Sequence, residues 1–169
     1  MYKLNYLKLQ QDRYWSDHYY LTREVIRDAV NGSPCLQVDL DALFLNQKDL
    51  GYNFEKLTQN RKAGDKLYKE LKKHIEIALE IVALAIKGKS IDEAYKRWQY
   101  NGRAVACVYH KYHYPIDFKV MNHHMQDHLR TTLAEATAII GKNCDESQKK
   151  GQLALDHVRD MSNYIMSKF

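Results

Sequence analysis

Hydrophobic residues recur every three or four positions through most of the chain, which is the spacing of an α-helix with one buried side. The clearest run extends from Arg61 to Ile86 and ends at Gly88. Similar runs extend from Asp117 to Gly141 and from Asp17 to Val30. Ser16 is the expected N-terminal cap of the helix over Asp17 to Val30. The pattern therefore predicts three long amphipathic helices.

Residues 32–60 have a less regular pattern. Leu36, Val38 and Leu40 alternate with polar residues as they would in a strand, whereas the apolar run from Ala42 to Leu45 suits a helix. We interpret this segment as helical.

The remaining residues predict shorter helices separated by turns. Ser90 and Glu93 have the spacing of a capping box, which opens a helix through about residue 100. Asn101 and Gly102 then predict a turn, and a further helix is expected over residues 103–114, before a proline.

The last helix is expected to begin at Asp145 or Ser147 and to run to the C-terminus, with Ala154, Leu155 and Val158 on its buried side. Five or six helices with short connections predict an all-α fold. We expect residues 1–169 to form a single, irregular helical bundle.

Composition agrees with a globular protein. Of the 169 residues, 45% are hydrophobic and 28% are charged, which suits one domain with a sizeable core. No apolar run reaches the roughly 18 residues of a membrane span. The N-terminus lacks the features of a secretion signal, so we expect a soluble, cytoplasmic protein with no membrane partner.

The cysteine and glycine residues limit the kinds of site that the chain can form. The widely spaced Cys35, Cys107 and Cys144 form no CxxC pair and are expected to be free thiols. No glycine-rich phosphate loop or nucleophile elbow is present, which argues against several enzyme classes. We therefore expect no cofactor and favour binding over catalysis.

The segment from Tyr95 to Pro115 has an unusual composition. Its 21 residues hold four Lys/Arg, two His and six aromatic residues but no acid, in a chain of net charge +5 and sequence pI near 9.0. Basic side chains neutralise phosphates, and aromatic rings stack on bases. The leading hypothesis is thus a small binding or regulatory protein whose partner is nucleic acid, DNA or RNA, or a protein that handles it.

This hypothesis names two sets of residues. The phosphate contacts are expected from Lys96, Arg97, Arg103 and Lys111. The stacking contacts are expected from Trp98, Tyr100 and Tyr114.

Helical geometry sorts the second half of this segment into two faces. The residues expected to face the core are Val105, Val108, Tyr109 and Tyr112. Those expected to face outward are Arg103, Cys107, His110 and Tyr114. An outward face of this composition also fits an ordinary solvated helix, or a protein–protein adaptor or inhibitor, for which sequence offers no signature.

Part of the segment resembles Myb-like helix-turn-helix modules. The resemblance rests on Gly102-Arg103, Val108, Lys111 and His113. It implies a recognition helix from Arg103 to Tyr114 that enters a DNA groove.

The spacing Arg103-x6-His110-x-Tyr112 resembles the motif of HEPN ribonucleases, which are helical bundles. The resemblance implies metal-independent RNA cleavage by these three residues and pairing of two subunits into a homodimer. The residue types suit the reaction, because His titrates near neutral pH and Arg supplies a cation beside the phosphate.

The histidines suggest a different class of site. His124 and His128 are four residues apart on one expected helix and can both bind one metal ion. The candidates to complete the ligand set are His74, Glu76 and Glu80, or His157 and Asp160. Hydrogen bonding between helices explains the same histidines without a metal.

Overall fold

The computed structural model describes residues 2–169, with side chains from residue 4 onward, and consists of six helices. Their bounds are α1 Tyr2–Asn31, α2 Leu36–Thr58, α3 Arg61–Ile86, α4 Asp92–Tyr112, α5 Phe118–Ile140 and α6 Cys144–Met166. No strand occurs in this part of the chain, so the predicted all-α bundle is confirmed. Among the described helices, none combines the length and the apolar character that crossing a bilayer requires.

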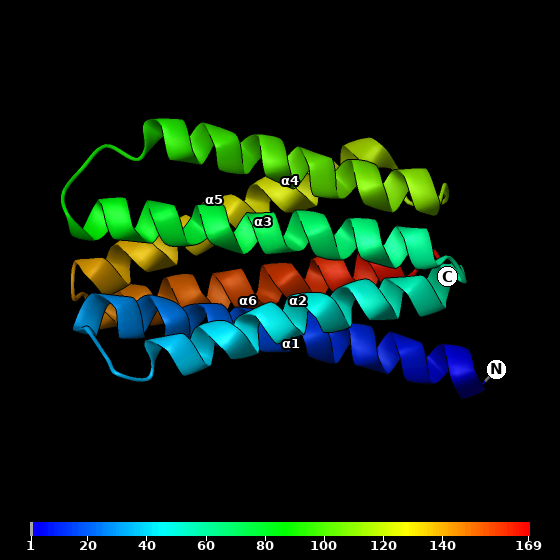
Figure 1. Cartoon of the computed structure of the whole chain (residues 1–169), viewed down its shortest axis with the longest axis horizontal. Coiled ribbons are helices and arrows are strands. Elements are labelled where there is room, and N and C mark those ends of the chain that lie inside the picture. Colours follow the sequence, from blue (N-terminus) through cyan, green and yellow to red (C-terminus); the bar gives the residue numbers. More distant parts are fainter. Residues whose placement is uncertain (1) are drawn as a thin grey trace.

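The helices run up and down along one long axis, and each packs against the next one in sequence (Figure 1). Helix α6 packs against α1 and closes the ring, while α5 also contacts α1 and α3 across the middle. Since the number of helices is even, both ends of the chain lie at the same end of the bundle (Figure 1). The basic and aromatic segment lies on α4, between α3 and α5.

Two of the expected helices are longer or more regular than the sequence indicated. Helix α1 begins at Tyr2, well before Ser16, because Leu7 and Trp15 extend its buried face toward the N-terminus. Residues 36–58 form one continuous helix, which confirms the helical interpretation of this segment. Of the three alternating residues, Leu36 and Leu40 are half-buried, whereas Val38 is exposed on the outer side of the helix.

The predicted turn at Asn101 and Gly102 is wrong, because α4 continues through both residues. Asn101 is buried, and its side-chain amide donates to the Glu70 carbonyl of α3 at 3.1 Å. A side chain at Gly102 would lie 3.3 Å from Leu129 of α5. The two residues therefore allow close packing within a helix, and the helix-turn-helix arrangement that they suggested is absent.

Two helix starts also differ from expectation. Helix α6 begins at Cys144 because Asn143, rather than Asp145 or Ser147, caps it and accepts a hydrogen bond from the Glu146 N–H. The capping box expected at Ser90 does not form, since its hydroxyl instead bonds to Asp92.

Helices α2 and α3 approach each other closely at Gly51 and Gly64. A Cβ atom at Gly64 would lie 2.7 Å from the Gly51 carbonyl oxygen, and one at Gly51 would lie 2.8 Å from the Tyr68 Cβ. Backbone atoms cannot turn aside as a flexible side chain can. Glycine at both positions thus sets the distance between the two helices.

Gly64→Ala is expected to lower the free energy of unfolding by about 1–3 kcal/mol, because it overpacks this contact. Gly102→Ala is the control, since its closest neighbours are the ends of the Gln126 and Leu129 side chains and alanine favours a helix by up to about 1 kcal/mol. Urea unfolding measures both. Equal stability of the two variants would contradict the close approach at Gly64.

Candidate functional site

The two basic residues near the start of α4 are already paired. Lys96 Nζ lies 2.8 Å from Glu93 of the same helix, and Arg97 forms an ion pair with Glu80 of α3. All four side chains are largely exposed, so these pairs add little to stability. The two ion pairs reduce the net positive charge at the surface of the segment from Tyr95 to Pro115, because Glu80 and Glu93 lie outside this segment in the sequence but next to it in the structure.

The aromatic residues of this segment divide into buried and exposed groups. Trp98 is only 3% exposed, and its indole N–H donates to the His74 carbonyl at 3.0 Å. Its assignment to an exposed stacking surface is therefore corrected: the ring is part of the core. Tyr100 and Tyr114 are 74% and 83% exposed and remain open to a partner.

The two faces assigned to the second half of α4 agree with the structure. The four residues expected in the core are buried or half-buried: Val105, Val108, Tyr109 and Tyr112. Of the outward set, Arg103, Cys107 and Tyr114 are exposed, whereas His110 is half-buried. The helix ends at Tyr112, two residues earlier than expected, so Tyr114 lies in the connection to α5.

A stripe of four lysines follows the outer side of α3. Residues 61–73 hold six Lys/Arg against two acids. All six are exposed, and four of them occur at the i, i+4, i+7 and i+11 spacing of one helix face. We call these four the lysine stripe: Lys62, Lys66, Lys69 and Lys73. None of the four forms an ion pair within residues 2–169.

The lysine stripe runs along the edge of α3 that adjoins α4. Lys73 and Glu80 are seven residues apart on the same side of α3, and Glu80 pairs with Arg97 of α4. On α4, Tyr100 and Lys111 lie on the same side of the helix as Arg97. We call the lysine stripe together with Tyr100 and Lys111 the basic seam. It joins unpaired positive charge to an exposed aromatic ring.

Arg103 points to the other side of α4, toward α5. Its guanidinium carbon lies 5.1 Å from the centre of the Phe118 ring. The His110 ring lies 6.4 Å from the same ring, and its Nδ1 is 2.8 Å from the Ile116 carbonyl oxygen. Because a carbonyl only accepts, Nδ1 carries the proton and the other nitrogen, Nε2, is left as a base.

The ribonuclease-like motif is thus only partly assembled. Arg103 and His110 lie beside one ring, whereas Tyr112 packs into the apolar core. Arg103 supplies a positive charge near this ring, and His110 supplies a group that can accept a proton.

The proposed metal ligands do not surround one common position. His74 and His128 are buried, His124 lies beside His157 and Tyr164, and Glu80 is at the surface with Arg97. Within the described residues, no group of three His, Cys, Asp or Glu side chains has the geometry to hold a metal ion.

Instead, His74 and His128 form a buried cluster with His18. The His74 and His128 rings stack with centroids 5.6 Å apart, and the His18 ring lies 5.4 Å from His128. The three rings come from α3, α5 and α1, so they join helices on different sides of the bundle. Sequence analysis missed His18, because a single histidine on a helix has no characteristic spacing.

Hydrogen bonds hold these rings in defined orientations. Asn101 donates to a carbonyl of α3, so its side-chain oxygen accepts from His74 Nδ1 at 3.0 Å. Gln47 donates to His18 Nδ1 at 3.0 Å. His18 and His74 therefore each have a partner that suits a neutral ring.

Burial strongly favours the neutral form of all three histidines. It lowers the pKa of His18 from 6.5 to about 3, with a smaller contribution from His74. It lowers the pKa of His74 to about 4, against the opposing effect of its bond to Asn101. Burial, followed by the neighbouring histidines, holds the pKa of His128 well below its usual value.

A buried ion pair joins α1 to α5. The side chains of Arg23 and Glu135 are 8% and 4% exposed, and Arg23 Nη1 donates to Glu135 and, at 2.8 Å, to the Tyr19 hydroxyl. A Cβ atom at Gly151 of α6 would collide with Arg23 Nη1. Burial raises the pKa of Glu135, and the charge of Arg23 opposes this shift.

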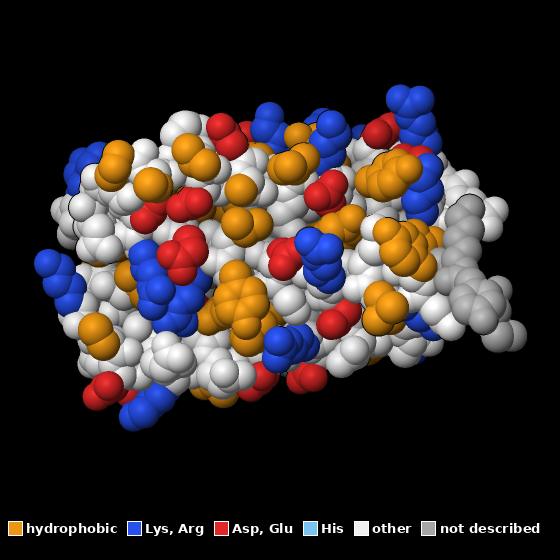
Figure 2. All heavy atoms as spheres, turned by 90° about the horizontal axis from the view of Figure 1, so that it is seen from below, with side chains coloured by type: hydrophobic (Ala, Val, Ile, Leu, Met, Phe, Trp, Pro, Cys, Tyr) orange, Lys and Arg blue, Asp and Glu red, His pale blue; other side chains and the backbone are white. Residues whose placement is uncertain are grey.

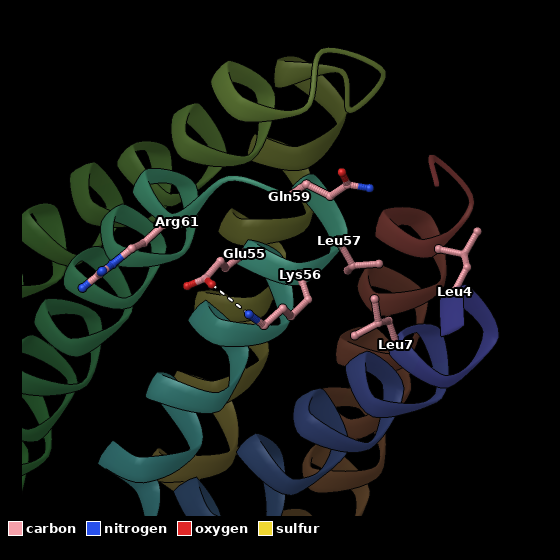
Figure 3. A pocket seen from close by; sticks show the side chains of 7 residues that line it. All are labelled: Leu4, Leu7, Glu55, Lys56, Leu57, Gln59 and Arg61. Carbon is pink, nitrogen blue, oxygen red and sulfur yellow. Dashed lines mark hydrogen bonds and ion pairs between the residues drawn. The ribbon is translucent and has the colours of Figure 1, made fainter. Parts of the chain in front are cut away.

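A hollow in the surface lies near the start of α1 and the end of α2 and has a volume of about 730 Å³. Leu4, Leu7 and Leu57 supply its apolar lining. Lys56 turns toward Glu55 and pairs with it at 3.0 Å, while Arg61 extends away from both (Figure 3). The polar part of the lining consists of Glu55, Lys56, Gln59 and Arg61.

No family model, no curated protein and no solved structure matches this chain.

Sequence analysis also missed the lysine stripe, although the signal was present. The four lysines have the same i, i+4, i+7, i+11 spacing as Arg103, Cys107, His110 and Tyr114. Leu67 and Leu71 define the apolar face of the same helix, and the lysine stripe lies on a different face.

Proposed function

We propose that the protein binds nucleic acid through the basic seam. The observation that carries the proposal is the lysine stripe, four exposed lysines on one helix face without internal ion pairs. From Lys62 to Lys73 the stripe extends about 16 Å, at about 1.5 Å per residue, which is long enough to follow several successive phosphates.

The two contributions from α4 favour a single strand as the ligand. Tyr100 presents an exposed ring beside the lysines, and a flat ring stacks on an unpaired base. Lys111 Nζ lies 5.7 Å from the centre of the Tyr112 ring, which leaves its charge near the seam. The seam also contains no base-reading side chain with fixed geometry, so the binding is expected to depend weakly on sequence.

The partner proposed from the sequence includes a protein that handles nucleic acid. Such a protein would need an acidic surface to match the seam. A binding measurement with only the purified protein and a nucleic acid distinguishes direct binding of nucleic acid from binding of a protein that handles it.

Replacing the four lysines of the stripe by glutamine is expected to weaken binding of a fluorescent single strand by at least about tenfold, since four phosphate contacts are lost. Fluorescence anisotropy measures the affinity. The matched control replaces four lysines elsewhere, Lys89, Lys142, Lys149 and Lys150, and removes the same charge. An equal loss in both variants would show that only net charge matters and would contradict a defined seam.

A second candidate function is RNA cleavage by Arg103 and His110. The hydrogen bond from His110 Nδ1 to the Ile116 carbonyl favours it, because this bond leaves Nε2 free to accept a proton. His110→Gln is expected to abolish cleavage of RNA in a metal-free buffer while binding stays within about twofold. Intact RNA after incubation with the unmodified protein would remove this candidate.

A further inference from the structure

Three hydrophobic side chains follow the outer side of α2. Val38, Leu45 and Tyr52 are 68%, 58% and 57% exposed, and they are seven residues apart. That spacing places them on one line along the helix, as in the contact of two paired helices. Figure 2 views the bundle from below, on the side where α1 and α2 lie, and shows hydrophobic side chains interspersed with opposite charges.

Charged residues occupy the gaps in this line. Asp41 lies four residues before Leu45, and Lys48 lies three residues after it, both on the same flank of the line. Neither forms an ion pair within the described chain, and Asp41 accepts only a hydrogen bond from Gln37 at 2.9 Å. We call these five residues the α2 face: Val38, Asp41, Leu45, Lys48 and Tyr52.

The α2 face is complementary to itself when a second α2 runs in the opposite direction. A two-fold axis beside Leu45 places the two Leu45 side chains together and each Val38 opposite Tyr52 of the other copy. This axis is perpendicular to both helices, so the flank with Asp41 and Lys48 lies on the same side of the interface in both copies. Asp41 of one copy therefore lies opposite Lys48 of the other. Every side chain of the α2 face then has a partner of suitable chemistry.

We infer that this surface binds a second copy of the chain, through antiparallel pairing of the two α2 helices. The inference rests on the mirrored order of apolar and charged residues about Leu45, which an unrelated partner would not require. It goes beyond the proposed nucleic-acid binding, since α2 packs against α1 and α3 and the basic seam lies on α3 and α4.

The contact is short. From Val38 to Tyr52 it extends about 21 Å along the helix, at about 1.5 Å per residue. A contact of one helix face forms a small interface, so the dimer is expected to dissociate on dilution.

Sedimentation of the full chain over a range of concentrations tests the inference. The unmodified protein should pass from monomer to dimer, and Leu45→Glu should raise the dissociation constant by about tenfold or more by burying two like charges together. Circular dichroism checks that the variant remains folded, which is expected because Leu45 is exposed.

A charge exchange tests the direction of pairing. Asp41→Lys and Lys48→Asp should each weaken the dimer, because each brings two like charges together at the interface. The double variant should restore it to within about threefold of the unmodified protein. Failure of the double variant to restore the dimer would overturn antiparallel pairing.

Crosslinking gives a second readout that does not depend on affinity. In a background in which the three native cysteines are replaced by serine, Leu45→Cys should form a disulfide-linked dimer on oxidation, whereas Val38→Cys alone should not. A protein that stays monomeric at every concentration in which it is soluble, or a dimer unaffected by the Leu45 variants, would overturn the inference.

Discussion

At pH 4 the protein is expected to be largely unfolded, although it is folded at pH 7, because three neutral histidines are buried together in its core. His18, His74 and His128 are each at most 3% exposed, and their pKa values are all depressed by burial. Protonation of any of them inside the bundle would place a charge in an apolar environment.

The direction of the pH dependence of stability follows from the protonation of the folded and the unfolded chain. The unfolded chain takes up protons on these histidines as the pH falls below 6.5, whereas the folded chain resists until about pH 4 for His74 and about pH 3 for His18. The free energy of unfolding therefore falls with pH in this window. Each histidine lowers the free energy of unfolding by about 1.4 kcal/mol per pH unit, and the three together lower it by about 4 kcal/mol per pH unit. Over two pH units the loss is about 8 kcal/mol, which is comparable with the total stability of about 5–15 kcal/mol of a typical domain.

Urea unfolding followed by circular dichroism between about pH 7 and pH 5 measures this slope. His74→Gln removes one of the titrating groups and should reduce the slope by about one third, whatever its effect on stability at pH 7. His123→Gln is the control, because the His123 side chain is 76% exposed and lies outside the cluster. A urea midpoint that does not change over this range would contradict the buried, neutral cluster.

Glu135→Ala is expected to lower the free energy of unfolding by about 3–5 kcal/mol, because it leaves the charge of Arg23 buried without a partner. The exposure of both side chains is below one tenth, so water cannot replace the lost carboxylate. Gly151→Ala should also be strongly destabilising, since the added methyl group would occupy the position of Arg23 Nη1.

A double variant separates the pair from simple loss of packing. Arg23→Met with Glu135→Leu removes both charges and retains the volume, so its stability should return to within about 1–2 kcal/mol of the unmodified protein. Chemical unfolding measures all three variants. A loss below about 1 kcal/mol for Glu135→Ala would mean that the two residues are not a buried pair in solution.

The sequence predicted the fold class well and the continuity of its helices less well. The apolar spacing of Leu67, Leu71 and Ile75 is determined by the chain itself, so α3 was placed within its observed bounds. Asn101 and Gly102 are typical turn residues when only their neighbours in sequence are considered. Their helical state depends on contacts with α3 and α5, which local sequence does not contain.

The same distinction explains the candidate site. The exposure of Arg103 and Cys107 follows from helix periodicity, but the burial of Trp98 and the pairing of Arg97 with Glu80 depend on how α3 and α4 pack. The lysine stripe was readable from sequence, whereas its position beside Tyr100 and Lys111 was not. Residues far apart in sequence can be assigned to one surface only when the bundle is known.

The most direct test of nucleic-acid binding is the salt dependence of affinity for a labelled single strand, measured by anisotropy between about 50 and 200 mM salt. With about five lysines of the basic seam at phosphates, the slope of log K against log salt should be about −3.5. The variant that lacks the lysine stripe should approach a slope of about −1. Absence of binding at the lowest salt, or a slope that the variant leaves unchanged, would contradict the account.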